Sequence, residues 1–158
     1  MKIVIGSDHR GYDLRRIVTD FLQSENYEVE EFGAHDKGIV DYPDVASDIA
    51  KLVSHGEADR GILICGTGIG MCVVANKFPG IRAASCSNDV IAELSRRHNN
   101  ANILCLSGDM LGERSCVSLV KTWLETGFDG GRHQVRIEKI NELEKKLLIN
   151  PKLSAIKR

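Results

Sequence analysis

Near the middle of the chain stands Gly61-Ile62-Leu63-Ile64-Cys65-Gly66-Thr67-Gly68-Ile69-Gly70, a continuously apolar run that passes straight into a loop of alternating glycines. Strands covered on both faces have such apolar runs, so this one predicts a central strand of a parallel sheet. Glycines at alternate positions leave backbone N–H groups uncovered at the start of a helix, where they can hold an anion. The stretch therefore predicts both a fold class and the place of a site.

On both sides of this stretch, short apolar runs alternate with amphipathic segments. We expect strands at Lys2–Gly6, Glu28–Phe32, Gly61–Cys65, Ile81–Ser85 and Ile103–Leu106. Helical stripes of apolar residues three and four positions apart cover Leu14–Leu22, Val45–Val53 and Cys116–Leu124, and a last helix is expected from about Arg132 to Leu148. The alternation predicts an α/β fold, a Rossmann-like doubly wound parallel sheet of about five strands with an extra C-terminal helix.

The composition is that of an ordinary globular protein of 158 residues. We expect a single α/β domain over residues 1–148 and a basic C-terminal tail over 149–158. The net charge of -1 provides no general field that would attract nucleic acid or an acidic membrane. No apolar run approaches the length that crosses a bilayer, and Lys2-Ile3-Val4-Ile5 is too short for a signal peptide. Neither nucleic acid nor a membrane is expected as a partner.

The five cysteines form an odd set without a Cys-x-x-Cys pair or a zinc-ligand spacing. They indicate reduced thiols in a cytoplasmic protein. Cys65 differs from the others because the start of a helix beside it lowers the pKa of a thiol, which can then act as a base or a nucleophile. The alternative is a buried structural thiol, the role we assign to Cys72, Cys86, Cys105 and Cys116.

The glycine loop has two further interpretations. A dinucleotide site is one, with Asp89 near the distance expected for a ribose-binding acid, but Gly66-x-Gly68-x-Gly70 lacks the final x-x-Gly spacing. A P-loop is excluded because no Gly-Lys-Ser/Thr follows.

Two more loops follow predicted strands, whose carboxyl ends form the ligand crevice in such sheets. Ser7-Asp8-His9-Arg10-Gly11 offers Asp8 and His9 to substrate hydroxyls or an anion, although a capping Asp8 and a solvated His9 would also explain it. Val40-Asp41-Tyr42-Pro43-Asp44 offers Tyr42 to close over a ligand, although a turn explains most of that segment.

Polar residues also gather where strands begin. The segment His98-Asn99-Asn100-Ala101-Asn102 precedes the fifth strand, and so many polar residues are unusual for a simple connector. The alternative is an ordinary turn, which Asn clusters favour. Arg132 and Arg136 lie four positions apart at the amino end of the last helix, where the helix dipole disfavours cations. They predict a phosphate clamp, with a solvated helix face as the alternative.

These two groups of residues belong to opposite edges of one sheet. Asp8, Tyr42 and Cys65 follow strands, whereas His98 and Arg132 lie on the side where strands begin. They can share a site only if a second subunit supplies one group. We therefore expect a homodimer or higher homo-oligomer with shared active sites.

Several motifs can be considered together with the central stretch. They are Ser7-Asp8-His9-Arg10-Gly11, Val40-Asp41-Tyr42-Pro43-Asp44, Asn76-Lys77, Gly80-Ile81-Arg82-Ala83-Ala84, His98-Asn99-Asn100-Ala101-Asn102 and Gly130-Gly131-Arg132-His133-Gln134. As a set, over about residues 1–145, they closely resemble the ribose-5-phosphate isomerase B family, which also holds allose- and galactose-6-phosphate isomerases. The resemblance implies an aldose-ketose isomerase of the non-oxidative pentose phosphate pathway. It implies no metal and no organic cofactor.

The resemblance also implies roles for individual residues. Cys65 would move the proton between C1 and C2 through an enediolate, with support from Thr67, and His98 would assist ring opening. The intermediate would be stabilised by the loop Gly66, Thr67, Gly68, Ile69 and Gly70. Sugar contacts are implied for Asp8, His9, Tyr42 and Asn99, and phosphate contacts for Arg132 and Arg136.

One position departs from the family pattern. The family usually carries a phosphate-binding arginine where this chain has Asp109, and an anion there weakens phosphate binding unless a cation compensates. Either Arg114 or Lys77 would provide that cation, or the loop would turn away from the phosphate. Three functional alternatives stay open: a hexose 6-phosphate isomerase, a non-catalytic sugar-phosphate-binding subunit or sensor, and a dinucleotide-binding protein.

Overall fold

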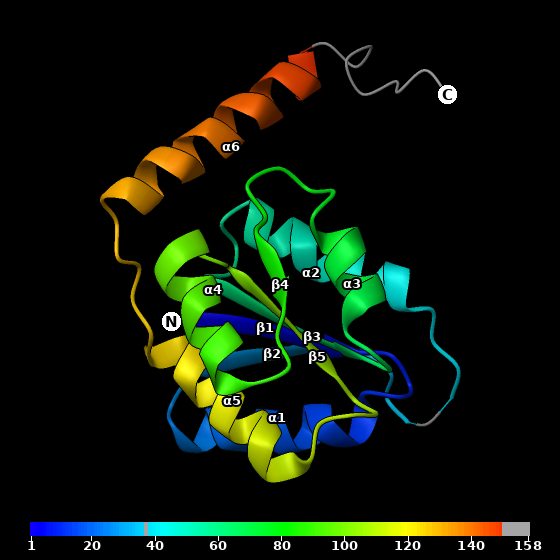
Figure 1. The fold of residues 1–158 in the computed structure, drawn as a ribbon. Helices are drawn as coiled ribbons and strands as arrows, with labels where there is room; N and C mark the ends of the chain where they lie inside the picture. Colours follow the sequence, from blue (N-terminus) through cyan, green and yellow to red (C-terminus); the bar gives the residue numbers. More distant parts are fainter. Residues whose placement is uncertain (37, 150–158) are drawn as a thin grey trace.

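The computed structural model describes residues 1–36 and 38–149, and Figure 1 shows a twisted sheet at the centre of the molecule with helices on both faces. All five strands are parallel and pair in the order β2-β1-β3-β5-β4. They are β1 (Lys2–Ser7), β2 (Glu28–Gly33), β3 (Arg60–Cys65), β4 (Ala83–Ser85) and β5 (Ile103–Ser107). The expected doubly wound parallel sheet is confirmed.

Six helices connect and flank the strands (Figure 1). They are α1 (Tyr12–Ser24), α2 (Tyr42–Ser54), α3 (Ile69–Ala75), α4 (Asp89–Asn99), α5 (Glu113–Glu125) and α6 (Arg132–Ile149). The helices α1, α4 and α5 bury apolar residues against one face of the sheet, and α2 and α3 against the other. The apolar stripes read from the sequence are the buried stripes of α1, α2 and α5.

The strand β4 is shorter than the sequence predicts. It begins at Ala83 instead of Ile81, because the Arg82 N–H donates to the side-chain oxygen of Asn102 at 2.8 Å. Ile81 is nevertheless buried, so its apolar character reflects packing at the sheet edge and not ladder pairing.

The ligand crevice of such a sheet lies where the chain order reverses, which here is between β1 and β3. Their carboxyl ends are held close by the loop after β1. The Asp8 N–H donates to the Ile64 carbonyl at 3.2 Å, and a Cβ on Gly11 would lie 2.3 Å from the same oxygen. Only glycine fits there, so the β1 loop is fixed directly beside the end of β3.

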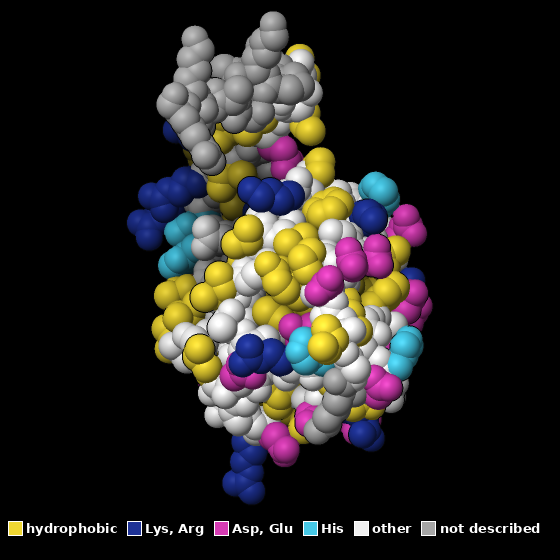
Figure 2. Space-filling view, turned by 90° about the vertical axis from the view of Figure 1, so that its right-hand side faces the viewer, with side chains coloured by type: hydrophobic (Ala, Val, Ile, Leu, Met, Phe, Trp, Pro, Cys, Tyr) yellow, Lys and Arg dark blue, Asp and Glu magenta, His cyan; other side chains and the backbone are white. Residues whose placement is uncertain are grey.

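The helix α6 extends away from the body as an arm (Figure 1). Its carboxylate Glu144 accepts the N–H of Gly80 at 2.9 to 3.0 Å, while several of its apolar side chains are exposed. These are Val135, Ile140, Leu143, Leu147, Leu148 and Ile149. Figure 2 shows hydrophobic side chains on one face of the body and on the arm above it.

The predicted tail, apart from Ile149 at the end of α6, falls on residues 150–158, outside the described part of the chain. Within the described ranges, no helix has both the length and the apolar character needed to cross a membrane.

Candidate active site

The thiol of Cys65 lies at the carboxyl end of β3, in a cavity of about 360 Å³. The cavity is lined by Asp8, Arg10, Tyr42, Cys65, Gly66, Thr67, Ile69 and Gly70. Cys65 is only 4% exposed, and its Sγ accepts the backbone N–H of Gly68 at 3.2 Å. A protected thiol thus faces the start of a glycine loop, as the sequence predicts.

The glycine loop is fixed by the loop that follows β5. The Gly108 N–H donates to the Cys65 carbonyl at 2.8 Å, and the Asp109 N–H to the Gly66 carbonyl at 3.2 Å. The Ser107 hydroxyl also donates to the Gly66 carbonyl, at 2.7 Å. Sequence reasoning missed the contribution of Ser107 and Gly108, for which the only signal was a small polar turn at a strand end.

Two glycines of the loop are required by their surroundings. Gly68 has a φ of +76°, and a Cβ there would lie 2.9 to 3.1 Å from backbone atoms of Leu106. A Cβ on Gly70 would lie 2.7 Å from the ring of Tyr42. Tyr42 therefore packs directly on the loop and forms one wall of the cavity. The Thr67 hydroxyl accepts the N–H of Ile69 at 3.3 Å and so supports the same turn.

Asp8 lines the cavity and shapes its own loop, but it does not cap the following helix, so that alternative interpretation is wrong. Its Oδ1 accepts the N–H groups of Arg10 and Gly11 at 2.9 and 3.0 Å, which shapes the β1 loop. The helix α1 that follows has Gly11 at its N-cap position, without a side-chain cap. His9 is half-buried, and its Nδ1 is enclosed without a hydrogen-bond partner among the described residues.

Asp109 lies beside the cavity, paired with Arg10. The two oxygens of its carboxylate accept from Nε (3.2 Å) and Nη2 of the Arg10 guanidinium. The cation that pairs with Asp109 is thus Arg10 and neither Arg114 nor Lys77. Arg114 lies on α5 in a separate hollow with Ser87 and Asn88, and Lys77 follows α3 beside the arm of α6.

A second group of predicted residues gathers at the opposite edge of the sheet. His98 and Asn99 end the helix α4, and Arg132 begins α6. The rings of His98 and His133 stack with centroids 4.3 Å apart and planes 2° from parallel. Arg132 and Arg136 are exposed, and none of these residues lines the Cys65 cavity. The structure thus separates the two groups within one chain, as the topology predicts.

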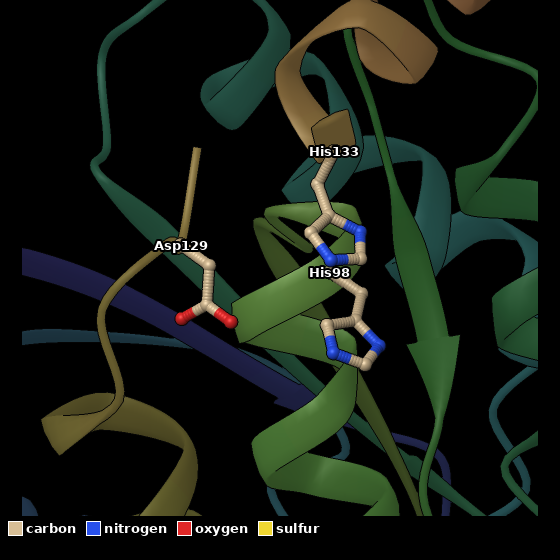
Figure 3. A group of neighbouring side chains, drawn as sticks. All are labelled: His98, Asp129 and His133. Atoms are coloured by element: carbon tan, nitrogen blue, oxygen red, sulfur yellow. The ribbon is translucent and has the colours of Figure 1, made fainter. Parts of the chain in front are cut away.

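Figure 3 shows His98 and His133 one above the other, with Asp129 to one side. Their potential ligand atoms lie within 4.8 Å of one another, but the arrangement does not fit a metal ion. In-plane lone pairs of parallel rings run alongside each other and do not converge. The guanidinium of Arg97 binds Asp129 at 3.2 Å and holds its pKa below the ordinary value. Arg132 and Arg136 add positive charge, which favours an anion here.

The remaining cysteines divide into two kinds. Burial raises the pKa of Cys86 to about 11 and that of Cys116 to about 12, and it also raises that of Cys105. These three are structural thiols, as expected. Cys72 is different: it is half-buried, and a hydrogen bond with Cys105 lowers its pKa to about 7. The expectation that Cys72 is a buried thiol is wrong in its burial, because the side chain is only half-buried.

The structure does not support Asp89 as the ribose-binding acid that the dinucleotide interpretation requires. Asp89 begins the helix α4 and accepts a hydrogen bond from the Ser118 hydroxyl at 3.1 Å, in a hollow separate from the Cys65 cavity. What remains is a doubly wound sheet with a thiol, a glycine loop and polar side chains at its switch point. Fold and site together are those of the class of sugar-phosphate isomerases that the motifs indicate.

Comparisons with known proteins agree. A model of the ribose/galactose isomerase family matches residues 3–140. Ribose-5-P isomerase B of Listeria innocua is 42% identical over 146 residues, which are 92% of this chain and 99% of that protein. The structure of Clostridium thermocellum ribose-5-phosphate isomerase B is 53% identical, with a TM-score of 0.90 over 92% of this chain and 99% of its own.

A structure of Mycoplasma genitalium ribose-5-phosphate isomerase B with bound ribulose-5-phosphate is 41% identical, with a TM-score of 0.88. It is matched over 91% of this chain and 96% of its own. The chain belongs to the ribose/galactose isomerase family, and the family resemblance drawn from its motifs is confirmed.

Proposed function

We propose that this chain interconverts ribose 5-phosphate and ribulose 5-phosphate, with Cys65 as the group that moves the proton. The observation that carries the proposal is the protected thiol at the switch point, with the Gly68 N–H directed at its sulfur. The relatives named ribose-5-phosphate isomerase B support the substrate, as does the relative with bound ribulose-5-phosphate.

The reaction moves a proton between neighbouring carbons. The Cys65 thiolate takes the proton from C2 of the open-chain aldose, and the C1 carbonyl becomes an enediolate oxygen. Returning the proton to C1, while the hydroxyl proton on O2 passes to O1, gives the ketose. In this proposal the enediolate oxygen meets N–H groups of the glycine loop other than those of Gly68 and Ile69, which already bond to the Cys65 sulfur and the Thr67 hydroxyl. Preorganised donors of this kind stabilise such a transition state strongly. Thr67 keeps the turn in shape through Ile69.

The other cavity residues hold the sugar. Asp8 uses Oδ1 for its own loop, which leaves Oδ2 to accept from a sugar hydroxyl. Tyr42 closes one wall over Gly70. His9 follows Asp8 but does not line the cavity, and its Nδ1 is enclosed without a partner among the described residues. Its contact with the sugar is proposed from the family resemblance alone.

A second subunit completes the site. His98 for ring opening, Asn99 for the sugar and the pair Arg132 and Arg136 for the phosphate lie at the opposite edge of the sheet in their own chain. A homo-oligomer brings them to the Cys65 cavity of a neighbour. The exposed apolar side chains of α6 supply surface for such an assembly.

Replacement of the thiol tests the chemistry. Cys65→Ala should lower kcat by about 10²- to 10⁴-fold, the usual contribution of a general base, while ribulose 5-phosphate binding measured by calorimetry is retained. Cys116→Ala is the matched control, because Cys116 is buried on the other face of the sheet and its variant should keep kcat per folded molecule. Full isomerase activity in Cys65→Ala would overturn the mechanism.

Subunit mixing tests the shared site. Cys65→Ala and His98→Ala homo-oligomers should each turn over ribose 5-phosphate slowly. Co-refolding them in equal amounts should restore about a quarter of the wild-type rate, since half of all dimers are mixed and hold one intact site of two. If each chain contained a complete site, the mixture would stay as inactive as its components.

The length of the preferred sugar phosphate is a separate question. The family description includes galactose isomerases, and a 39% identical relative is a D-erythrulose-4-phosphate isomerase. We expect the highest kcat/KM for ribose 5-phosphate when it is compared with allose 6-phosphate and galactose 6-phosphate. A higher value for either hexose would move the assignment to the hexose phosphates. Binding without turnover of any of them would favour a non-catalytic subunit.

A further inference from the structure

We propose that Arg10 is a further substrate-binding residue, which contacts the phosphate of the sugar phosphate, and that Asp109 is its positioning residue. The inference rests on the proposed function for the identity of the substrate. It depends on a side-chain pair that belongs to one chain and sits at the mouth of the Cys65 cavity.

The location of Arg10 is fixed on two sides. A Cβ on Gly66 would lie 3.0 Å from Cζ and Nε of Arg10, so the guanidinium lies against the backbone of the glycine loop. The carboxylate of Asp109 holds it from the other side. Asp109 is itself attached to the loop, because its N–H donates to the Gly66 carbonyl at 3.2 Å. The pair therefore keeps a fixed relation to Cys65.

The chemistry of the pair leaves Arg10 able to bind. A guanidinium has five N–H donors in a rigid fork, and Asp109 engages Nε and one N–H of Nη2. The remaining donors are directed away from Asp109, and the Arg10 side chain is 57% exposed. Guanidinium groups recognise phosphate through such paired donors. Asp109 thus fixes the direction of the fork without using all of it.

The charge inside the cavity indicates which part of the substrate Arg10 meets. The reacting carbons must lie at the Cys65 thiol, which is almost fully buried, so the far end of an extended sugar reaches the mouth. That end carries the phosphate. Among the described residues that line the cavity, Arg10 alone bears a formal positive charge, and Asp8 bears a negative one. A dianion at the mouth therefore needs Arg10 in addition to arginines supplied by a second subunit.

Two other roles for the pair make different predictions. A purely structural clasp between the β1 and β5 loops would affect folding and kcat for all substrates alike. A masking role, in which Asp109 neutralises Arg10, would make removal of Asp109 tighten phosphate binding. Kinetics and phosphate inhibition distinguish these roles from the proposed one.

The experiment compares Arg10→Ala, Asp109→Ala and the double variant with the wild-type enzyme. Arg10→Ala should raise the KM for ribose 5-phosphate and the inhibition constant of inorganic phosphate by about 10- to 100-fold, with kcat within a few-fold of wild type. Asp109→Ala should raise both by a smaller factor, and the double variant should match Arg10→Ala, because Asp109 acts only through Arg10. Unphosphorylated ribose lacks the group that Arg10 contacts, so any turnover of it should be the same in all of these variants as in the wild type.

Arg114→Ala is the matched control, an arginine outside the cavity whose loss should leave both constants unchanged. Three results would each overturn the proposal. They are an unchanged KM in Arg10→Ala, an equal loss of kcat/KM for phosphorylated and unphosphorylated sugar in that variant, and a lower KM in Asp109→Ala. An inactive wild-type protein would refute the proposed function instead, and calorimetry with inorganic phosphate would then still test Arg10.

Discussion

Gly68→Ala is the substitution that best tests how the glycine loop is built. Gly68 has a φ of +76°, and an added Cβ would lie 2.9 to 3.1 Å from the backbone of Leu106 on β5. The left-handed backbone costs an alanine about 1 kcal/mol, and overpacking against an immobile backbone adds about 1 to 3 kcal/mol. We expect a loss of about 2 to 4 kcal/mol in the free energy of unfolding, which lowers Tm by about 6 to 12 °C in a chain of this size.

Gly56→Ala provides the matched control, because Gly56 also has a positive φ (+74°) but a Cβ there meets no atom within 4 Å. It should lose only about 1 kcal/mol, or about 3 °C, and keep its kcat. Gly68→Ala should in addition lose kcat, because the N–H that binds the Cys65 sulfur moves with the loop. Calorimetric melting and isomerase assays measure both effects. Equal Tm losses in the two variants, with full activity in Gly68→Ala, would refute the close-approach argument.

Three further predictions concern single side chains. Arg15→Ala should lower the free energy of unfolding, measured in urea, by about 3 kcal/mol, since the buried guanidinium of Arg15 donates to the carbonyls of Phe32 and Ala34. The control is Arg16→Ala at an exposed position, and equal losses in the two variants would contradict this prediction. Burial and the charges of His98, Arg132 and Arg136 lower the pKa of His133, so the unfolded chain takes up a proton at this histidine at a higher pH than the folded chain does. The free energy of unfolding should therefore fall as the pH drops below about 6.5. In His133→Gln this dependence of the free energy of unfolding on pH should be weaker. In a Cys65→Ala background, iodoacetamide labelling of Cys72 should rise as the pH rises through about 7 and vanish in Cys65→Ala/Cys72→Ser; labelling that rises only near pH 9 would contradict the lowered pKa.

The fold could be predicted because its signal is local. Continuous apolar runs such as Ile62–Ile64 and Ile103–Leu106 are buried on both faces in the structure, which is what central parallel strands require. The stripes at Leu14–Leu22 and Cys116–Leu124 report helix faces in the same direct way. Element ends were less accessible, because they depend on distant partners. The start of β4 is moved by Asn102, and His98 and Asn99 belong to the last turn of α4.

The site could be predicted only in part, for the same physical reason. Loops at the carboxyl ends of strands are brought together by the sheet itself, so Asp8, Tyr42 and the glycine loop could be grouped from the sequence. Pairings between loops leave no trace in spacing. Arg10 and Asp109 are 99 positions apart in the sequence, and no motif around either residue predicts that the two form an ion pair. The sequence could therefore show that an anion at position 109 disfavours phosphate binding, but only the structure shows that Arg10 pairs with it.

The position of the Arg10–Asp109 pair bears on how the site is divided between subunits. Topology assigns Cys65 and the glycine loop to one edge of the sheet and the predicted phosphate clamp, Arg132 and Arg136, to the other. If all cations for the phosphate came from a second subunit, the isolated chain would hold no positive charge where the dianion enters. Arg10 supplies one in the same chain as the thiol, at a place fixed by the glycine loop through Asp109. A chain organised in this way can retain measurable affinity for inorganic phosphate even where subunit contacts are weakened, and that affinity should disappear with Arg10.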